Sequence, residues 1–238
     1  MSVSREVYST KLLYPLVNSC ADVTTNESPP SHGVRLPPGI EDGRFLEAIG
    51  RIDAANALDP NRITSRGMEA PKELVHAALA TGWAWRLREV DGDVPSEPLL
   101  LAARAHHIER WLVPRSAYPD GRTGYLRWRT GLHDFHARRA AAILESCGYD
   151  HPTIGETMAV IRKERPRANR DSQALEDALC LVFLETQLEL DWARIDDDKM
   201  VDVLRKTWRK MSGAGRDAAL ALTLSPRARA IVERALAG

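Results

Sequence analysis

The chain has 238 residues, of which 44% are hydrophobic and 28% are charged, and this composition excludes both a disordered chain and a membrane protein. Its length is sufficient to bury a core without disulfide support. Lysine plus arginine equals aspartate plus glutamate at 33 each, and this zero net charge argues against nucleic acid as a partner, because nucleic-acid-binding proteins usually carry a basic excess.

The amino-terminal segment, residues 1–40, holds five of the fourteen prolines and shows no periodic apolar pattern. We therefore predict a tail that is disordered or loosely packed, followed by one helical domain over residues 41–238. No window approaches the roughly 18 apolar residues needed to cross a bilayer, so no membrane association is expected. Cys20, Cys147 and Cys180 form no Cys-x-x-Cys pair, which favours a reducing, cytoplasmic location.

Apolar residues recur at helical spacing from Arg44 onward, and short breakers divide the chain. The pattern predicts helices over residues 44–58, 71–90, 97–112, 125–147 and 153–165. Residues 167–225 are free of proline and carry further helical pattern. Ser225-Pro226 predicts a final helix at 226–237, because serine is a good N-cap and proline suits the first helical turn. No segment alternates with period two, so the predicted fold class is all-α.

The residues that could carry chemistry are histidines on the earlier helices and carboxylates on a later one. They are His76, His106, His107, His133 and His136, followed by Glu176, Asp177 and Glu185. Carboxylates beside an apolar run are costly to bury unless they are paired or bound to a metal. Imidazole and carboxylate from several helices make a ligand set for zinc, manganese or iron. The alternative is that the histidines are ordinary helix residues and that the glutamates pair with arginines.

This order of residues resembles the HD-domain superfamily of all-helical metalloenzymes, whose motif has a lone histidine, a His-Asp pair and a later aspartate. His76 matches the lone histidine, His106 matches the histidine of the pair, and Asp177 matches the last aspartate. His107 stands where the motif has the aspartate of the pair, and His136 loosely matches an extra histidine of binuclear members. The resemblance implies a single HD-domain-like helical bundle that binds a divalent metal ion.

A second resemblance covers about residues 45–222 and rests on several long sequence motifs that occur in the same order. The similar stretches include residues 107–111, 114–119, 124–129, 175–185 and 204–211. They look like an uncharacterised family, the domain of unknown function DUF4202. This resemblance implies no activity, but it favours His107, His136, Glu176, Asp177 and Glu185 as the site residues.

Arginine supplies 27 of the 33 basic residues, and several arginines surround the candidate ligands. Arg115 and Arg122 lie before the long predicted helix and Arg127 lies within it, where guanidinium groups could grip a phosphate or carboxylate. A solvated, salt-bridged helix face fits the same pattern. The sequence contains no Gly-x-Gly-x-x-Gly, Walker or Gly-x-Ser-x-Gly motif, so dinucleotide binding, P-loop chemistry and serine-hydrolase chemistry are not expected.

The leading hypothesis is a metal-dependent hydrolase of a small anionic, phosphorylated substrate. In this hypothesis His107, His136 and Asp177 hold the metal, with His106 or His76 as a further ligand. Glu176 or Glu185 acts as base or orients a ligand, and the arginines bind the substrate. Two alternatives remain open: an HD-like di-iron oxygenase that uses the same residues, and a non-catalytic helical protein that binds a small anion or a protein partner.

Overall fold

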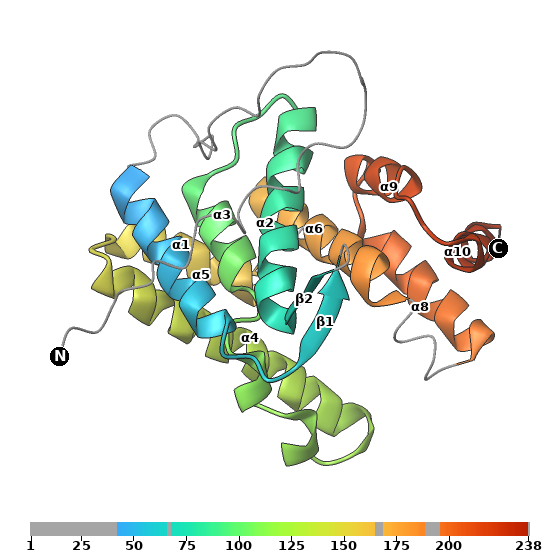
Figure 1. Cartoon of the computed structure of the whole chain (residues 1–238), viewed down its shortest axis with the longest axis horizontal. Coiled ribbons are helices and arrows are strands. Elements are labelled where there is room, and N and C mark those ends of the chain that lie inside the picture. Colours follow the sequence, from blue (N-terminus) through green and yellow to red (C-terminus); the bar gives the residue numbers. More distant parts are fainter. Residues whose placement is uncertain (1–41, 66–67, 165–168, 189–195, 238) are drawn as a thin grey trace.

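The structure is a computed structural model that describes residues 42–65, 68–164, 169–188 and 196–237, so the predicted tail over residues 1–40 lies outside the described residues. The all-α prediction is confirmed (Figure 1). The helices are α1 (Asp42–Asn56), α2 (Lys72–Val90), α3 (Glu97–Ala105), α4 (Gly121–Ser146), α5 (His151–Arg162), α6 (Arg170–Thr186), α8 (Asp197–Lys210), α9 (Gly213–Leu220) and α10 (Pro226–Leu236). Two short 3-10 turns, η2 (Arg110–Leu112) and η3 (Arg115–Ala117), precede α4.

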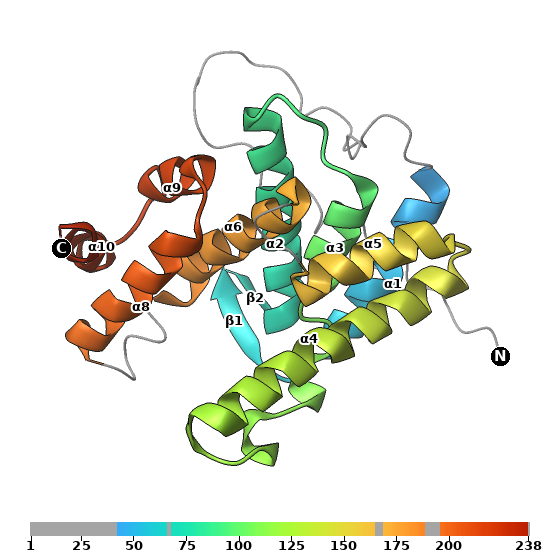
Figure 2. The same ribbon diagram turned by 180° about the vertical axis from the view of Figure 1, so that it is seen from behind.

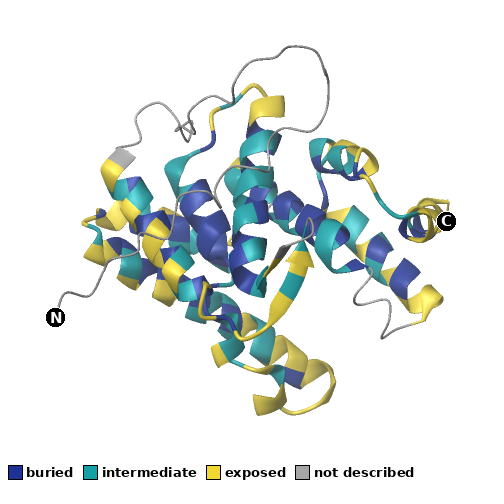
Figure 3. Ribbon diagram, in the orientation of Figure 1, coloured by how far each residue is buried: buried dark blue, intermediate teal, exposed yellow. Residues whose placement is uncertain are grey.

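Helix α2 lies at the centre of the molecule and packs against α6 on one side and α3 on the other. The α4–α5 pair covers α3, while α9 packs on α6 and α10 packs on α8 (Figures 1 and 2). Buried residues gather where α2, α3 and α6 face one another (Figure 3). Alanines at this junction, including Ala80, Ala84, Ala102, Ala103 and Ala178, are completely buried. Small side chains of this kind let the helix axes approach closely.

Helix termini follow the capping chemistry of the sequence. Ser96, Asp150, Asn169, Asp196, Ser212 and Ser225 each accept a hydrogen bond from a backbone N–H of the helix that they precede. Such a cap contributes about 1 kcal/mol to stability. The predicted cap at Ser225 is among them, and α10 begins with Pro226 as expected.

A two-stranded antiparallel hairpin, β1 (Arg62–Ser65) paired with β2 (Met68–Pro71), leads into α2 and was not predicted. Strands of four residues are too short to produce a period-two pattern in the sequence. The buried carboxylate of Asp59 fixes the junction, because its Oδ1 accepts from the backbone N–H of Asn61 at 2.9 Å and its Oδ2 accepts from that of Glu73 at 3.0 Å. The hairpin therefore positions the first turn of α2.

Helix α3 ends at Ala105, seven residues before the predicted end at residue 112. The chain leaves the helix because Glu109 adopts a left-handed conformation, with φ of 52°, that a helix cannot contain. The Glu109 N–H donates to Asn56 Oδ1, and its carboxylate accepts two hydrogen bonds from Arg139 of α4. His106 and His107 thus lie in a turn and not on the predicted helix.

The amino-terminal half of α4 and the segment before it project from the rest of the molecule (Figures 1 and 2). Gly124 allows their backbones to touch, because an added β-carbon there would lie only 1.8 Å from the Pro119 carbonyl oxygen. Trp128 Nε1 also donates to the Val113 carbonyl at 2.9 Å. Among the residues that the structure describes, no helix has the length and apolar character needed to cross a membrane.

Candidate metal centre

Three side chains of metal-ligating type meet between α2 and the turn after α3. Glu73 and His76 share one face of the first turns of α2, at positions i and i+3, and His107 comes from the turn. One possible ligand atom from each of the three lies within 4.8 Å of the other two. Within the described ranges this is the one group of at least three such residues that could hold a metal ion.

The carboxylate of Glu73 is buried and charged. Its Oε2 lies 3.5 Å from His76 Nδ1 and 3.3 Å from His107 Nδ1, yet it has no hydrogen bond of acceptable geometry. Burial raises the pKa of Glu73, but together the two imidazoles lower it by more than burial raises it, so the net pKa is well below its ordinary value. A buried, ionised oxygen whose contacts with the two imidazoles fall outside hydrogen-bond geometry is costly, and a cation at this position would relieve that cost.

The hydrogen bonds of His76 leave one of its nitrogens facing this oxygen. Thr186 Oγ1 lies 3.3 Å from His76 Nε2 and donates its only proton to the Val182 carbonyl at 2.7 Å. The hydroxyl can therefore only accept from His76, so Nε2 carries a proton and Nδ1 is the nitrogen that faces Glu73. A ring nitrogen and a carboxylate oxygen that face each other at 3.5 Å favour a proton or a metal ion close to both.

His107 is held from the other side by Arg110. Arg110 Nη1 lies 3.2 Å from His107 Nε2, and its guanidinium also stacks on the Trp128 ring at 5.0 Å. Because a guanidinium can only donate, Nε2 accepts and Nδ1 carries the proton that faces Glu73. Binding of a metal through Nδ1 requires that proton to leave. The His107 side chain is 30% exposed, although its Nδ1 is buried, so solvent reaches one edge of the ring but not the nitrogen that faces Glu73.

His106 and His136 lie beside His107 without belonging to the three-residue group. The ring centroids are 4.2 Å apart for His106 and His107, and 5.7 Å apart for His107 and His136. His106 Nδ1 donates to the Ala103 carbonyl and His136 Nδ1 donates to the Ile108 carbonyl, each at 2.8 Å, so both rings keep an Nε2 lone pair. The Nε2 of His136 is buried and has no partner.

The imidazoles of His106, His107 and His136 are uncharged at neutral pH. Burial lowers the pKa of His136 to about 3 and lowers the pKa values of His106 and His107 as well. A hydrogen bond from one ring nitrogen to a backbone carbonyl, which fixes the other nitrogen as an acceptor, is the usual support for a metal-binding histidine. Of the histidines that the sequence predicts for the site, the structure brings together His76, His106, His107 and His136.

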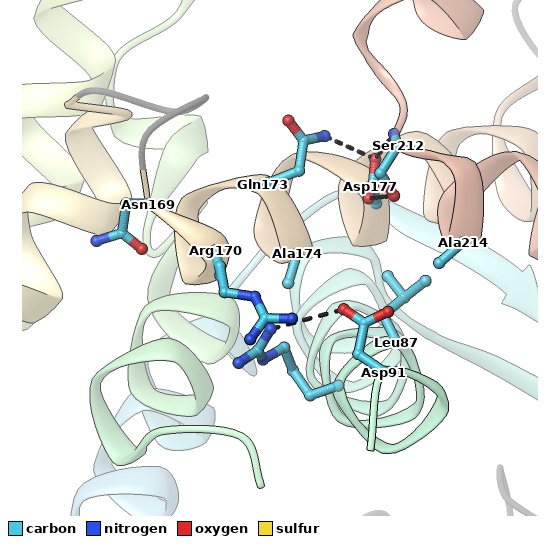
Figure 4. A pocket seen from close by; sticks show the side chains of 10 residues that line it. Leu87, Asp91, Asn169, Arg170, Gln173, Ala174, Asp177, Ser212 and Ala214 are labelled. Carbon is cyan, nitrogen blue, oxygen red and sulfur yellow. Dashed lines mark hydrogen bonds and ion pairs between the residues drawn. The ribbon is translucent and has the colours of Figure 1, made fainter. Parts of the chain in front are cut away.

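The structure does not bring Asp177 to these histidines. Its Oδ1 accepts from the Ser212 N–H at 2.9 Å and from Gln173 Nε2 at 3.0 Å, and its Oδ2 accepts from the Ser212 hydroxyl at 2.6 Å. Burial raises the pKa of Asp177, whereas the hydrogen bonds from Ser212 oppose that rise. Asp177 lines a pocket of about 210 Å³ between α2, α6 and α9, where Figure 4 shows it turned toward Ser212.

The two predicted catalytic glutamates are also engaged elsewhere. Glu176 contacts Lys163 and lies 3.6 Å from Lys210, and although burial raises its pKa, Lys163 lowers it to a net value below the ordinary one. Glu185 Oε2 accepts from Trp83 Nε1 at 3.0 Å. Glu185 and Thr186 line a cavity of about 590 Å³, and Glu73 is not among its lining residues.

The three predicted substrate arginines differ in position. Arg115 Nη1 donates to the Tyr118 carbonyl at 2.8 Å, while Arg122 and Arg127 are exposed on α4. Arg110 is the arginine in contact with the centre.

Sequence reasoning missed Glu73, although a glutamate three residues before a histidine on one helix was a signal that could have found it.

Comparisons with known proteins give a family and no activity. A family model described as "Domain of unknown function (DUF4202)" matches residues 46–232. No curated protein and no solved structure matches the chain.

Proposed function

The chain belongs to the DUF4202 family, and since that description names no activity, we propose from the site that the protein is a metal-dependent hydrolase of an anionic substrate. Glu73, His76 and His107 hold the divalent ion in this proposal. The observation that carries it is the three-residue cluster, whose ligand atoms lie within 4.8 Å of one another. Two histidines and one glutamate with an open side are the ligands of many catalytic zinc sites, whereas structural zinc sites are closed by four protein ligands.

A divalent ion at this position supplies a Lewis acid and lowers the pKa of water toward neutrality. The protein supplies the rest. Glu73 offsets the charge of the ion, Thr186 fixes the tautomer of His76, and His106 and His136 present neutral Nε2 atoms beside the centre. Arg110 reaches the exposed side of His107 and is placed to hold an anionic substrate there. Unlike the HD-domain pattern, this ligand set excludes the later Asp177, so the proposal rests on the geometry of this chain alone.

The test compares Glu73→Gln with the wild-type protein and with Glu145→Gln, which removes an exposed carboxylate of α4. Calorimetric titration with Zn²⁺ and Mn²⁺ measures binding, and hydrolysis of bis(p-nitrophenyl) phosphate measures turnover. We expect Glu73→Gln to weaken cation binding by about 10- to 100-fold or more and to lose the cation-dependent hydrolysis. Glu145→Gln should behave like the wild type.

The alternatives give different results in the same experiment. A wild-type protein that binds neither cation contradicts the proposal and favours the non-catalytic helical protein. Cation binding that Glu73→Gln leaves unchanged contradicts the assigned ligands. Oxygen consumption with added Fe²⁺, in place of hydrolysis, would favour the di-iron oxygenase.

A further inference from the structure

The positive charge of this neutral chain is concentrated in one segment. Residues 110–139 contain seven arginines and two aspartates, with no lysine or glutamate, so the segment carries a formal charge of seven minus two, or +5. Two of the arginines are neutralised, because Arg138 pairs with Asp134 and Arg139 pairs with Glu109. Within the part of the chain that the structure describes, the other five form no ion pair with a carboxylate, although Arg110 lies in the field of Glu73 and Arg129 in that of Glu176. These five are Arg110, Arg115, Arg122, Arg127 and Arg129.

Two of these arginines, Arg122 and Arg129, share a face of α4 with an aromatic ring, and Arg110 of η2 stacks on a second ring. Arg122, Tyr125 and Arg129 occupy positions i, i+3 and i+7 and therefore share one face of the helix. The Tyr125 ring lies 5.9 Å from the Trp128 ring, on which Arg110 stacks in turn. We call the set formed by Arg110, Arg122, Tyr125, Trp128 and Arg129 the arginine–aromatic surface. It includes residues of the first turns of α4, whose projecting end is seen in Figure 1, and Arg110, which contacts His107.

Part of this surface is open to solvent, because Arg122 and Tyr125 are exposed whereas Arg110, Trp128 and Arg129 are half-buried. Tyr125 is 43% exposed and its neighbour Leu126 is 48% exposed. Unpaired guanidinium groups attract phosphate oxygens, and an exposed aromatic ring beside them offers a stacking platform for a base. Charges spread over about two turns of a helix fit an extended polyanion better than a single small anion, because Arg122 and Arg129 are about 10 Å apart along the helix axis.

We propose that the arginine–aromatic surface binds single-stranded nucleic acid, with phosphates on the arginines and a base stacked on Tyr125. The combination of arginine with aromatic rings, and the absence of lysine from the segment, favours this partner over an anionic membrane. The interaction goes beyond the proposed hydrolase and does not require a bound cation. A strand that follows the surface toward Arg110 would end at the exposed side of His107.

The experiment measures the fluorescence anisotropy of a labelled oligothymidylate titrated with the full-length protein, in the presence of EDTA and over a series of salt concentrations. We expect affinity to fall as salt rises. The double variant Arg122→Gln/Arg129→Gln should bind more weakly and should reduce the slope of log K against log salt by about 1.4, which is about 0.7 for each lost phosphate contact. Tyr125→Ala should lower the affinity about fivefold or more.

The control is Arg51→Gln/Arg138→Gln, which removes the same charge from two exposed arginines that are already paired with Glu47 and Asp134. It should keep the wild-type slope. Three outcomes would overturn the proposal: no binding of the oligonucleotide, an equal loss in the control variant, or tighter binding to phosphatidylserine vesicles through the same residues. Because EDTA is present, none of these results depends on cation binding, so failure here and failure of the proposed metal site are separate results.

Discussion

Arg110 has two effects on the candidate centre. Its guanidinium occupies the Nε2 lone pair of His107 and so favours the tautomer with a proton on Nδ1, the nitrogen that faces Glu73. It also places a positive charge beside the position that a metal ion would take. Both effects oppose cation binding, although the same group could hold an anionic substrate.

Replacing Arg110 with methionine should therefore tighten cation binding by about 1 kcal/mol, or about fivefold, as expected for removing a nearby like charge under partial screening. Titration calorimetry with Zn²⁺ measures this change. Arg115→Met is the matched control, because Arg115 comes from the same loop and donates to a backbone carbonyl instead of an imidazole. Unchanged or weaker binding by Arg110→Met would mean that Arg110 does not face the cation.

At the scale of single residues, the sequence indicated most of the candidate cluster. Histidines are scarce, and their order along the helices predicted that His76, His106, His107 and His136 would matter. Glu73 was missed because glutamate is common on helix surfaces and its burial depends on the hairpin and on Asp59. Asp177 was assigned by its place in a motif, and a motif does not reveal that Ser212 and Gln173 would take its oxygens.

Asp177 connects two elements, because it joins α6 to the first turn of α9. Its carboxylate binds Ser212, and the Ser212 hydroxyl in turn accepts from the Gly215 N–H at 3.1 Å. An added β-carbon at Gly215 would lie 2.7 Å from Asp177 Cγ, while one at Gly213 would meet nothing within 4 Å. Two glycines of one short helix therefore differ only in what they face.

Gly215→Ala should destabilise the protein by about 1–3 kcal/mol, since the new methyl group must displace the Asp177 side chain. Gly213→Ala should be neutral, or stabilising by up to about 1 kcal/mol, because alanine is the better helix former. Urea unfolding measures both changes. Cation affinity should be the same in the two variants if Asp177 is not a ligand. Equal stability of the variants would contradict the tight contact.

Helix positions were predictable at the scale of elements, but some of their ends were not. Breakers and caps such as Pro71 and Ser225 act within a few residues, so sequence alone located the starts of α2 and α10. The end of α3 depends on Glu109, whose left-handed backbone is held by Asn56 and Arg139 from distant parts of the chain. No local signal reports contacts of that kind, and the same limit hid the β1–β2 hairpin.

At the scale of the whole molecule, a charge sum of zero conceals an uneven distribution. The expectation that nucleic acid is not a partner was based on that sum, whereas residues 110–139 carry +5 and the remaining residues carry the opposite charge. Arginines that form no ion pair can be identified only once the fold shows which pairs form. The residue types of the arginine–aromatic surface could therefore be read from the sequence, but which of its arginines form no ion pair could not.

His133 makes the stability of the whole molecule depend on pH. Burial, followed by the charges of Lys163 and Arg129, lowers the pKa of His133 to about 4 from an ordinary value of 6.5. Between these two values the unfolded chain binds more protons than the folded one, so the free energy of unfolding rises with pH. This stabilising contribution is complete above pH 6.5 and is lost as the pH falls toward 4.

The slope due to one such group cannot exceed about 1.4 kcal/mol per pH unit, and the partial exposure of His133 reduces it to about 0.5–1. His133→Gln should remove this part of the slope. Urea unfolding in EDTA at pH 5 and pH 7 measures the difference, and His151→Gln, which removes an exposed histidine of α5, should leave the slope unchanged. An unaltered slope in His133→Gln would show that the ring is protonated as easily in the folded protein as in water.

The backbone contact between Gly124 and Pro119 has a mechanical consequence. Together with the hydrogen bond from Trp128 to the Val113 carbonyl, it fastens the loop and the start of α4 into one stiff arm. The base of that arm is the turn that carries His107. Because Arg110 at the foot of this segment contacts the His107 imidazole, a displacement of the arm relative to α2 would also move that ring.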